Sequence, residues 1–88
     1  MSDLDGLEQF PCDYTFKVFG RRSDAFVERV REIIGRSLGC VPAEAVSVRE
    51  SSHGRYVSVT VSIRVDTRSQ LERVYADLRA EDEVLLYI

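Results

Sequence analysis

Hydrophobic and polar residues alternate most regularly between positions 56 and 65 of the chain. Valine or isoleucine occupies every second position there, and tyrosine, serine, threonine and arginine fill the positions between them. Because successive side chains of a strand point to opposite faces, this alternation predicts a strand with one buried face. A similar alternation over residues 13–19 predicts an earlier strand, which we expect Gly20 to end.

Two segments instead repeat apolar residues at helical spacing. Ser23 is a favourable N-cap, and the helix predicted after it closes at Gly39 with an apolar stripe of Phe26, Val30, Ile33, Ile34 and Leu38. Residues 67–70 have the form of a capping box. The stripe that follows them is Leu71, Val74, Tyr75 and Leu78.

Short strands complete the pattern. Val46 and Val48 indicate a second strand, Gly54 a turn after it, residues 79–83 an acidic turn, and residues 84–88 a last strand. The order β-α-β-β-α-β predicts an α+β, ferredoxin-like domain with a four-stranded antiparallel sheet of order 4-1-3-2 and both helices on one face. We expect a single domain over residues 10–88, preceded by a flexible tail over residues 1–9.

Composition excludes several classes of protein. The 88 residues carry a net charge of −3, which disfavours broad electrostatic binding to nucleic acid. No apolar run approaches the roughly 20 residues that cross a bilayer, and the acidic N-terminal segment is unlike a secretory signal. The sequence therefore predicts a cytoplasmic protein that does not bind membranes.

Two motifs resemble those of a known family. Phe10-Pro11 followed by residues 16–20 resembles the opening motif of the YbeD-like family of bacterial proteins of unknown function, and residues 51–60 resemble its second motif. The resemblance implies a ferredoxin-like fold similar to ACT domains, which are small regulatory modules that bind amino acids and pair with one another. It implies no established activity and no catalytic residues.

One end of the predicted sheet is a candidate ligand site. Arg21, Arg22 and Ser23 precede a helix N-terminus, where free N–H groups and the helix dipole favour an anion, and His53 and Arg55 belong to a turn at the same end. ACT domains are similar in placing ligands near a glycine-containing loop after the first strand. A small anionic or amino-acid effector is the functional hypothesis. Solvated arginines paired with acidic residues 81–83 are the alternative.

The uncovered face of the sheet is a second candidate surface, on which we expect Lys17, Phe19, Tyr56 and Arg64. Aromatic residues on two central strands resemble the stacking positions of RNA-recognition motifs, but no RNP signature is present. Leu85 and Tyr87 are expected opposite Val84, Leu86 and Ile88, so that the last strand is apolar on both sides. This pattern indicates a homodimer or a partner protein and leaves a monomer open.

Catalytic and metal chemistry lack the residues they need. His53 is the single histidine and no acidic residue stands at triad spacing to it, so we expect no catalytic residues. Cys12 and Cys40 are far apart, which predicts reduced thiols, although a disulfide between them is geometrically conceivable. We expect no metal and no cofactor. The sequence favours a non-enzymatic, ACT-like regulatory or interaction module, with an RNA- or nucleotide-binding module as the alternative.

Overall fold

The computed structural model describes residues 10–51 and 53–88, so the expected tail over residues 1–9 lies outside the described residues. The elements follow one another as β1 (Cys12–Arg21), α2 (Asp24–Leu38), the short 3-10 helix η1 (Ala43–Ala45), β2 (Val46–Glu50), β3 (Tyr56–Val65), α3 (Arg68–Ala80) and β4 (Val84–Tyr87). This is the expected β-α-β-β-α-β order, with η1 as an addition that the sequence pattern did not indicate.

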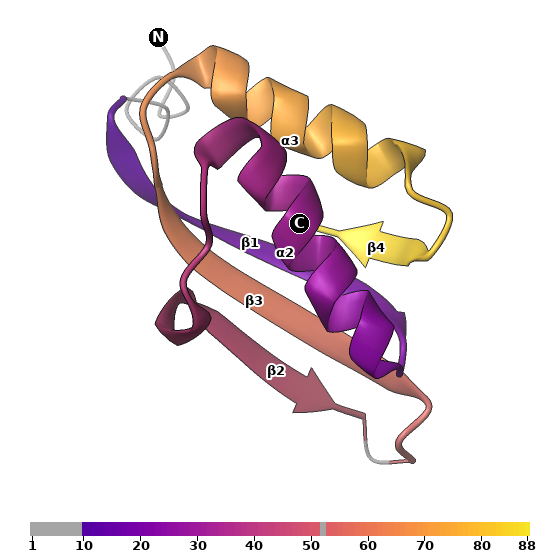
Figure 1. Ribbon diagram of the computed structural model, residues 1–88. Helices are drawn as coiled ribbons and strands as arrows, with labels where there is room; N and C mark the ends of the chain where they lie inside the picture. Colours follow the sequence, from indigo (N-terminus) through magenta and orange to yellow (C-terminus); the bar gives the residue numbers. More distant parts are fainter. Residues whose placement is uncertain (1–9, 52) are drawn as a thin grey trace, which may run out of the picture.

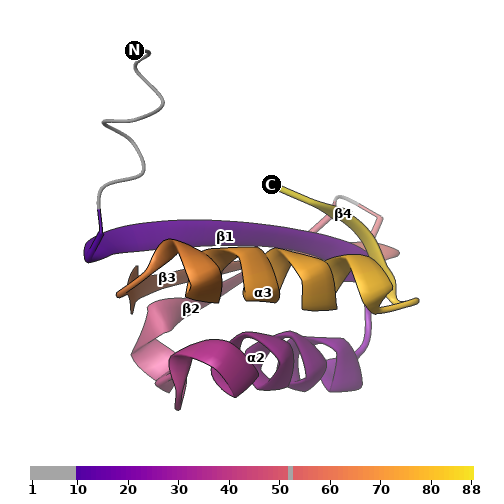
Figure 2. The same ribbon diagram turned by 90° about the horizontal axis from the view of Figure 1, so that it is seen from above.

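The strands form one sheet in the order β2-β3-β1-β4, and all three pairings are antiparallel. Both helices lie against the same face of this sheet, and the opposite face carries no helix (Figures 1 and 2). The ferredoxin-like fold is therefore confirmed. The predicted strand order 4-1-3-2 is also confirmed, because it is the observed order β2-β3-β1-β4 counted from the opposite edge of the sheet. The two central strands, β1 and β3, are also the longest, with ten residues each.

The hydrophobic core lies between the helices and the covered face of the sheet. In β1 and β3 the side chains at every second position face this core and most of them are buried, because partners in register share a face. Each large apolar side chain that is fully buried contributes about 1.5–3 kcal/mol of transfer free energy. The core comprises Phe16, Val18, Phe26, Val30, Ile33, Ile34, Val41, Val57, Val59, Val61, Val65, Leu71, Val74 and Leu78.

Both helices begin at the caps that the sequence predicts. The Ser23 hydroxyl accepts a hydrogen bond from the backbone N–H of Phe26 at 3.0 Å. The Thr67 hydroxyl accepts from the N–H of Gln70 at 3.2 Å, and the Gln70 side chain accepts from the Thr67 N–H in return. These bonds satisfy N–H groups that have no partner within the helix, which fixes where each helix starts.

Strand β1 does not end at Gly20 as predicted but continues to Arg21. The φ angle of Gly20 is not positive. A Cβ atom at this position would overlap the ring of Phe26 and lie 2.8 Å from the carbonyl oxygen of Glu83. Glycine is therefore required by the close packing of α2 and of the α3–β4 turn on β1, and not by the backbone conformation of β1.

The expected faces of the last strand need a correction. The pairing of β1 with β4 shifts register between Phe19 and Gly20, and this bulge interrupts the alternation of side chains. Val84 pairs with Gly20 and therefore packs against the core with Tyr87. Leu86 and Ile88 lie on the uncovered face; Leu86 pairs with Phe19, and Ile88 exchanges two backbone hydrogen bonds with Lys17.

Aromatic rings join α3 to the sheet. Tyr75 of α3 packs against Tyr14, Phe16 and Tyr87, with ring centroids 5.5–6.4 Å apart. The Tyr75 hydroxyl donates a hydrogen bond to the Tyr14 hydroxyl at 3.2 Å. Burial, and then this hydrogen bond, raise the pKa of Tyr75 above its ordinary value.

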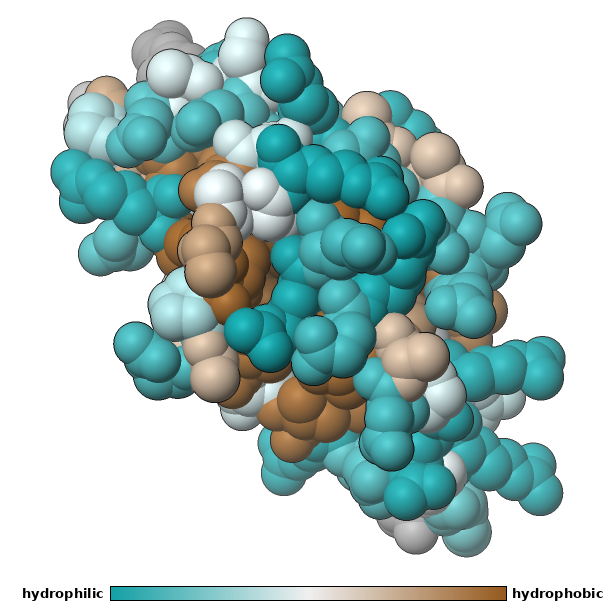
Figure 3. Space-filling view, viewed as in Figure 1, coloured by the Kyte–Doolittle hydropathy of each residue, from teal (hydrophilic) through white to brown (hydrophobic). Residues whose placement is uncertain are grey.

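The outer sides of the helices are hydrophilic, and apolar surface emerges beside α2 (Figure 3). On this side of the molecule Val48 of the edge strand β2 is 47% exposed. Among the described residues no helix is both long enough and apolar enough to span a bilayer.

Candidate functional site

Three connections meet at the end of the sheet where β1 finishes. The backbone N–H of Arg22 donates to the carbonyl of Arg55 at 2.9 Å, which joins the β1–α2 turn to the β2–β3 hairpin. The absence of a side chain on Gly20 lets the ring of Phe26 and the α3–β4 turn approach β1 closely. Residues far apart in the sequence are thereby brought together around the N-terminus of α2 (Figure 1).

A hollow of about 280 Å³ lies at this end and is here named the end hollow. Its lining combines one cation, two carboxylates, the cap of α2 and two apolar side chains. The lining residues are Arg21, Ser23, Phe26, Asp82, Glu83 and Leu85. Within the described part of the chain, Arg21 has no ion-pair partner.

The predicted ligand residues do not all line the end hollow. Arg21 and Ser23 do, and the Ser23 hydroxyl is already engaged in capping α2. Arg22 instead directs its Nε to Glu50 Oε2 at 2.8 Å, outside the hollow. His53 and Arg55 are exposed on the hairpin, and within the described residues no hydrogen bond links either side chain to Arg21 or Ser23.

The ion pairs at this end differ from the expected ones. The sequence suggests residues 81–83 as partners of Arg21 and Arg22, but Arg22 forms its ion pair with Glu50. The hydrogen bond to Glu50, and then the negative charge of Glu50, raise the pKa of Arg22. Glu81 is bound by Arg29 Nε at 2.9 Å, and hydrogen bonds to Glu32 and then Glu81 raise the pKa of Arg29. Asp82 and Glu83, which line the end hollow, have no ion-pair partner among the described residues.

Sequence reasoning missed the apolar and acidic members of the end hollow. The sequence predicts Phe26 as a core residue because it belongs to the apolar stripe of the first helix, and its side chain is 1% exposed. The sequence suggests residues 81–83 only as counter-charges for the arginines, whereas Asp82 and Glu83 line the same cavity as Arg21. The β-α-β-β-α-β topology does predict that the turns after β1 and after α3 lie at one end of the sheet, but it does not show that their side chains line a common cavity.

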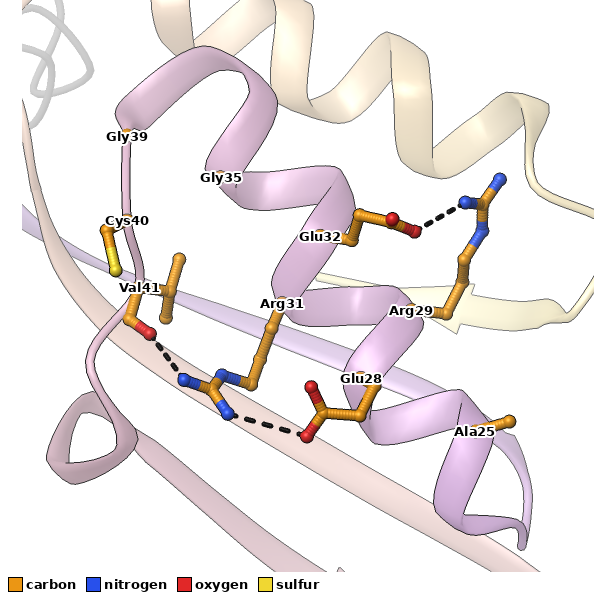
Figure 4. Close-up of a pocket in the computed structure, with 9 residues that line it drawn as sticks. All are labelled: Ala25, Glu28, Arg29, Arg31, Glu32, Gly35, Gly39, Cys40 and Val41. Atoms are coloured by element: carbon orange, nitrogen blue, oxygen red, sulfur yellow. Dashed lines mark hydrogen bonds and ion pairs between the residues drawn. The ribbon is translucent and has the colours of Figure 1, made fainter.

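A larger hollow, of about 630 Å³, lies along α2 beside the loop that follows it (Figure 4). Its charged side chains satisfy one another: Arg31 bonds both Glu28 and the Val41 carbonyl oxygen, and Arg29 bonds Glu32. Each of the four charged residues that line this hollow therefore already has a partner. The end hollow therefore remains the better candidate.

The uncovered face carries the four residues predicted for it. Lys17 and Phe19 pair in register with Thr60 and Ser58, while Tyr56 and Arg64 lie on the same face of β3. Phe19 and Tyr56 help to line a third hollow, of about 280 Å³, together with Arg49, Glu50, Ser51, Val57 and Ser58.

Reactive groups are dispersed in the described residues. Cys12 and Cys40 are both free thiols. In residues 10–51 and 53–88 no group of three or more His, Cys, Asp or Glu side chains is arranged so that it could hold a metal ion.

Comparison with known proteins places the chain in a family. The family model described as "Protein of unknown function (DUF493)" matches residues 5–88. The chain belongs to this family. It is 42% identical over 77 residues to a UPF0250 protein of Pseudomonas paraeruginosa, which covers 86% of this chain and 83% of that one. A UPF0250 protein of Idiomarina loihiensis is 36% identical over 82 residues, covering 92% and 90%.

Solved structures share the fold of this DUF493 member. The solution structure of an H. pylori protein superposes with a TM-score of 0.68 at 17% identity, covering 91% of this chain and 84% of that one. The ACT domain from the GTP pyrophosphokinase of Chlorobium tepidum superposes with a TM-score of 0.63 at 12% identity, covering 86% and 84%. The resemblance to the YbeD-like family and the ACT-like fold are confirmed. None of these relatives indicates a catalytic function.

Proposed function

We propose that this DUF493 protein is a non-enzymatic regulatory module of the bacterial cytosol and that its end hollow binds a free amino acid. The observation that carries the proposal is the combination, in one small hollow, of a cation with two carboxylates and two apolar side chains. Opposite charges around one hollow suit a zwitterion better than a simple anion, because Asp82 and Glu83 repel an anion that has no amino group.

Each group of an amino acid has a counterpart in the end hollow. The guanidinium of Arg21 is suited to bind a carboxylate through two parallel hydrogen bonds. Asp82 and Glu83 attract an ammonium group, and Leu85, which is 55% exposed, offers apolar surface to a side chain. The volume of about 280 Å³ lies just below the roughly 300–1,000 Å³ of typical small-molecule sites, which favours one amino acid over a nucleotide.

The regulatory part of the proposal rests on the fold. An ACT domain of a GTP pyrophosphokinase has the same arrangement of helices and strands. Pairing of two copies, which the ACT resemblance implies, would be available at the edge strands β2 and β4, since each has one neighbour in the sheet. An enzymatic role is not favoured, because the exposed His53 has no acidic partner within the described residues.

Calorimetric titration with each of the twenty amino acids tests the proposal. We expect a subset to bind with a dissociation constant below one millimolar, and Arg21→Gln to weaken binding at least ten-fold. Arg22→Gln is the matched control, because it removes the same charge at the next residue but outside the hollow. The amine and carboxylic acid analogues of the bound amino acid should each bind much more weakly.

Two results would contradict the proposal. Failure of every amino acid to bind at millimolar concentration would remove the ligand class. Equal binding of the carboxylic acid analogue would show that Asp82 and Glu83 take no part and that the site recognises anions alone.

A further inference from the structure

Exposed apolar side chains gather at one end of the uncovered face. Phe19 lies beside Leu86, and Ile88 lies beside Lys17 on the neighbouring strand. Tyr56, Leu86 and Ile88 are 47%, 55% and 63% exposed. Phe19 and Tyr56 also line the third hollow. Single exposed apolar residues are ordinary on protein surfaces, but a group of neighbouring ones marks an interaction surface.

The charged side chains next to this apolar group that have no ion-pair partner among the described residues are basic. Lys17 precedes Phe19 by two residues on β1, and Arg49 lies in the same cross-strand row as Phe19, with Ser58 between them. Within the described residues neither Lys17 nor Arg49 has an ion-pair partner. The whole chain has a net charge of −3, so this positive charge is local. The open-face patch is defined as Lys17, Phe19, Arg49, Tyr56, Leu86 and Ile88.

We propose that the open-face patch docks an acidic segment of a partner protein. Carboxylates of the segment would pair with Lys17 and Arg49, and its apolar side chains would cover Phe19, Leu86 and Ile88. Aromatic residues and arginine are the types enriched at protein–protein interfaces, and charge complementarity selects the partner. The patch shares no residue with the end hollow, so the two proposals stand independently.

A second copy of the chain is a poor occupant for this surface. Face-to-face pairing would bring Lys17 and Arg49 against the same cations of the other copy, and like charges in apposition oppose association. Glu50 borders the third hollow but is already paired with Arg22 at 2.8 Å. Pairing of copies through an edge strand would leave the open-face patch free.

A single-stranded nucleic acid fits the patch less well. Such ligands need a line of cations along the phosphates and aromatic rings on which bases stack. The patch offers two unpaired cations, and two of its apolar members, Leu86 and Ile88, are aliphatic and cannot stack. Leu86 and Ile88 instead match the apolar side chains of a protein segment.

The size of the patch sets the strength of binding. Six residues are far fewer than the roughly 20–30 per side of a standard interface, so we expect a weak, transient complex. Because its ion pairs lie at the surface, binding should weaken as salt rises.

Nuclear magnetic resonance titration with a synthetic probe peptide tests the proposal. The probe is a twelve-residue peptide in which glutamate alternates with leucine and phenylalanine, and its matched counterpart has lysine in place of every glutamate. We expect the acidic peptide to shift amide resonances around the open-face patch and the basic peptide to leave them unchanged.

Charge reversal sharpens the test. The double variant Lys17→Glu/Arg49→Glu should weaken binding of the acidic peptide at least ten-fold and acquire binding of the basic peptide. Arg36→Glu/Arg73→Glu makes the same change in net charge on exposed positions of the two helices, and it should retain binding within about two-fold.

Several outcomes would overturn the proposal. These are no shifts at millimolar acidic peptide, equal losses in the two double variants, or shifts at the patch with a twelve-nucleotide single-stranded RNA but not with the peptide. Growth of the molecular mass with protein concentration in light scattering, abolished by Lys17→Glu/Arg49→Glu, would assign the patch to a second copy instead.

Discussion

Replacing Gly20 with alanine probes the packing that forms the end hollow. The added methyl group would overlap the ring of Phe26 and lie 2.8 Å from the carbonyl oxygen of Glu83. Phe26 is 1% exposed and packs within the buried core, so any movement of its ring disturbs that packing. The α3–β4 turn would have to move away from β1, or the ring would leave its position in the core.

The expected cost follows from two opposing effects. Overpacking a filled core costs about 1–3 kcal/mol. Replacing glycine by alanine also restricts the unfolded chain, which returns about 0.4–1 kcal/mol. We therefore expect the free energy of unfolding of Gly20→Ala to fall by about 1–2 kcal/mol, which corresponds to a decrease in Tm of roughly 4–16 °C for a domain of this size.

Urea denaturation and thermal melting of Gly20→Ala measure this loss, with Gly35→Ala as the control. Gly35 lies inside α2, and a Cβ atom there meets nothing within 4 Å. The same substitution should therefore raise the free energy of unfolding by about 0.5–1 kcal/mol through helix propensity. If Gly20→Ala is as stable as the wild type, or gains as Gly35→Ala does, the packing argument is wrong.

Three further substitutions test separate interactions. Thr67→Ala removes the N-cap of α3 and should lower the free energy of unfolding by about 1 kcal/mol. Arg22→Ala should leave the free energy of unfolding almost unchanged, because its ion pair with Glu50 is exposed to solvent; urea denaturation measures both. Folding raises the pKa of Tyr75, so the stability that this residue contributes is complete below its unfolded pKa of about 10 and is lost as the pH rises further. Tyr75→Phe should lose the hydrogen bond to Tyr14 at neutral pH and show a shallower decline above about pH 10, in urea titrations at several pH values.

Alternation and helical spacing predicted the fold because they record burial directly. Valine and isoleucine alternate along residues 57–65, and the structure buries most of these side chains against the helices. Ser23 and Thr67 predicted the helix starts because capping is a local interaction between residues three positions apart.

Features that depend on tertiary contacts were not predictable in the same way. The sequence pattern predicts that Gly20 ends β1, but the structure requires glycine there because of its contact with Phe26. That contact spans the β1–α2 turn, so the local pattern does not show it. The bulge beside Phe19 puts Val84 on the covered face of the sheet with Tyr87, whereas simple alternation predicts opposite faces for these two residues. The register between β1 and β4 is set by packing and not by the local pattern. Arg21 lines the end hollow and Arg22 does not, because Arg22 pairs with Glu50, a residue of a different strand.

The most direct measurement of the central claim is a nuclear magnetic resonance titration of the wild-type protein with a pool of the twenty amino acids. The account predicts saturable shifts confined to residues 20–26 and 81–85, which the Arg21→Gln variant abolishes. No shifts at millimolar concentration, or shifts that persist unchanged in Arg21→Gln, would contradict it.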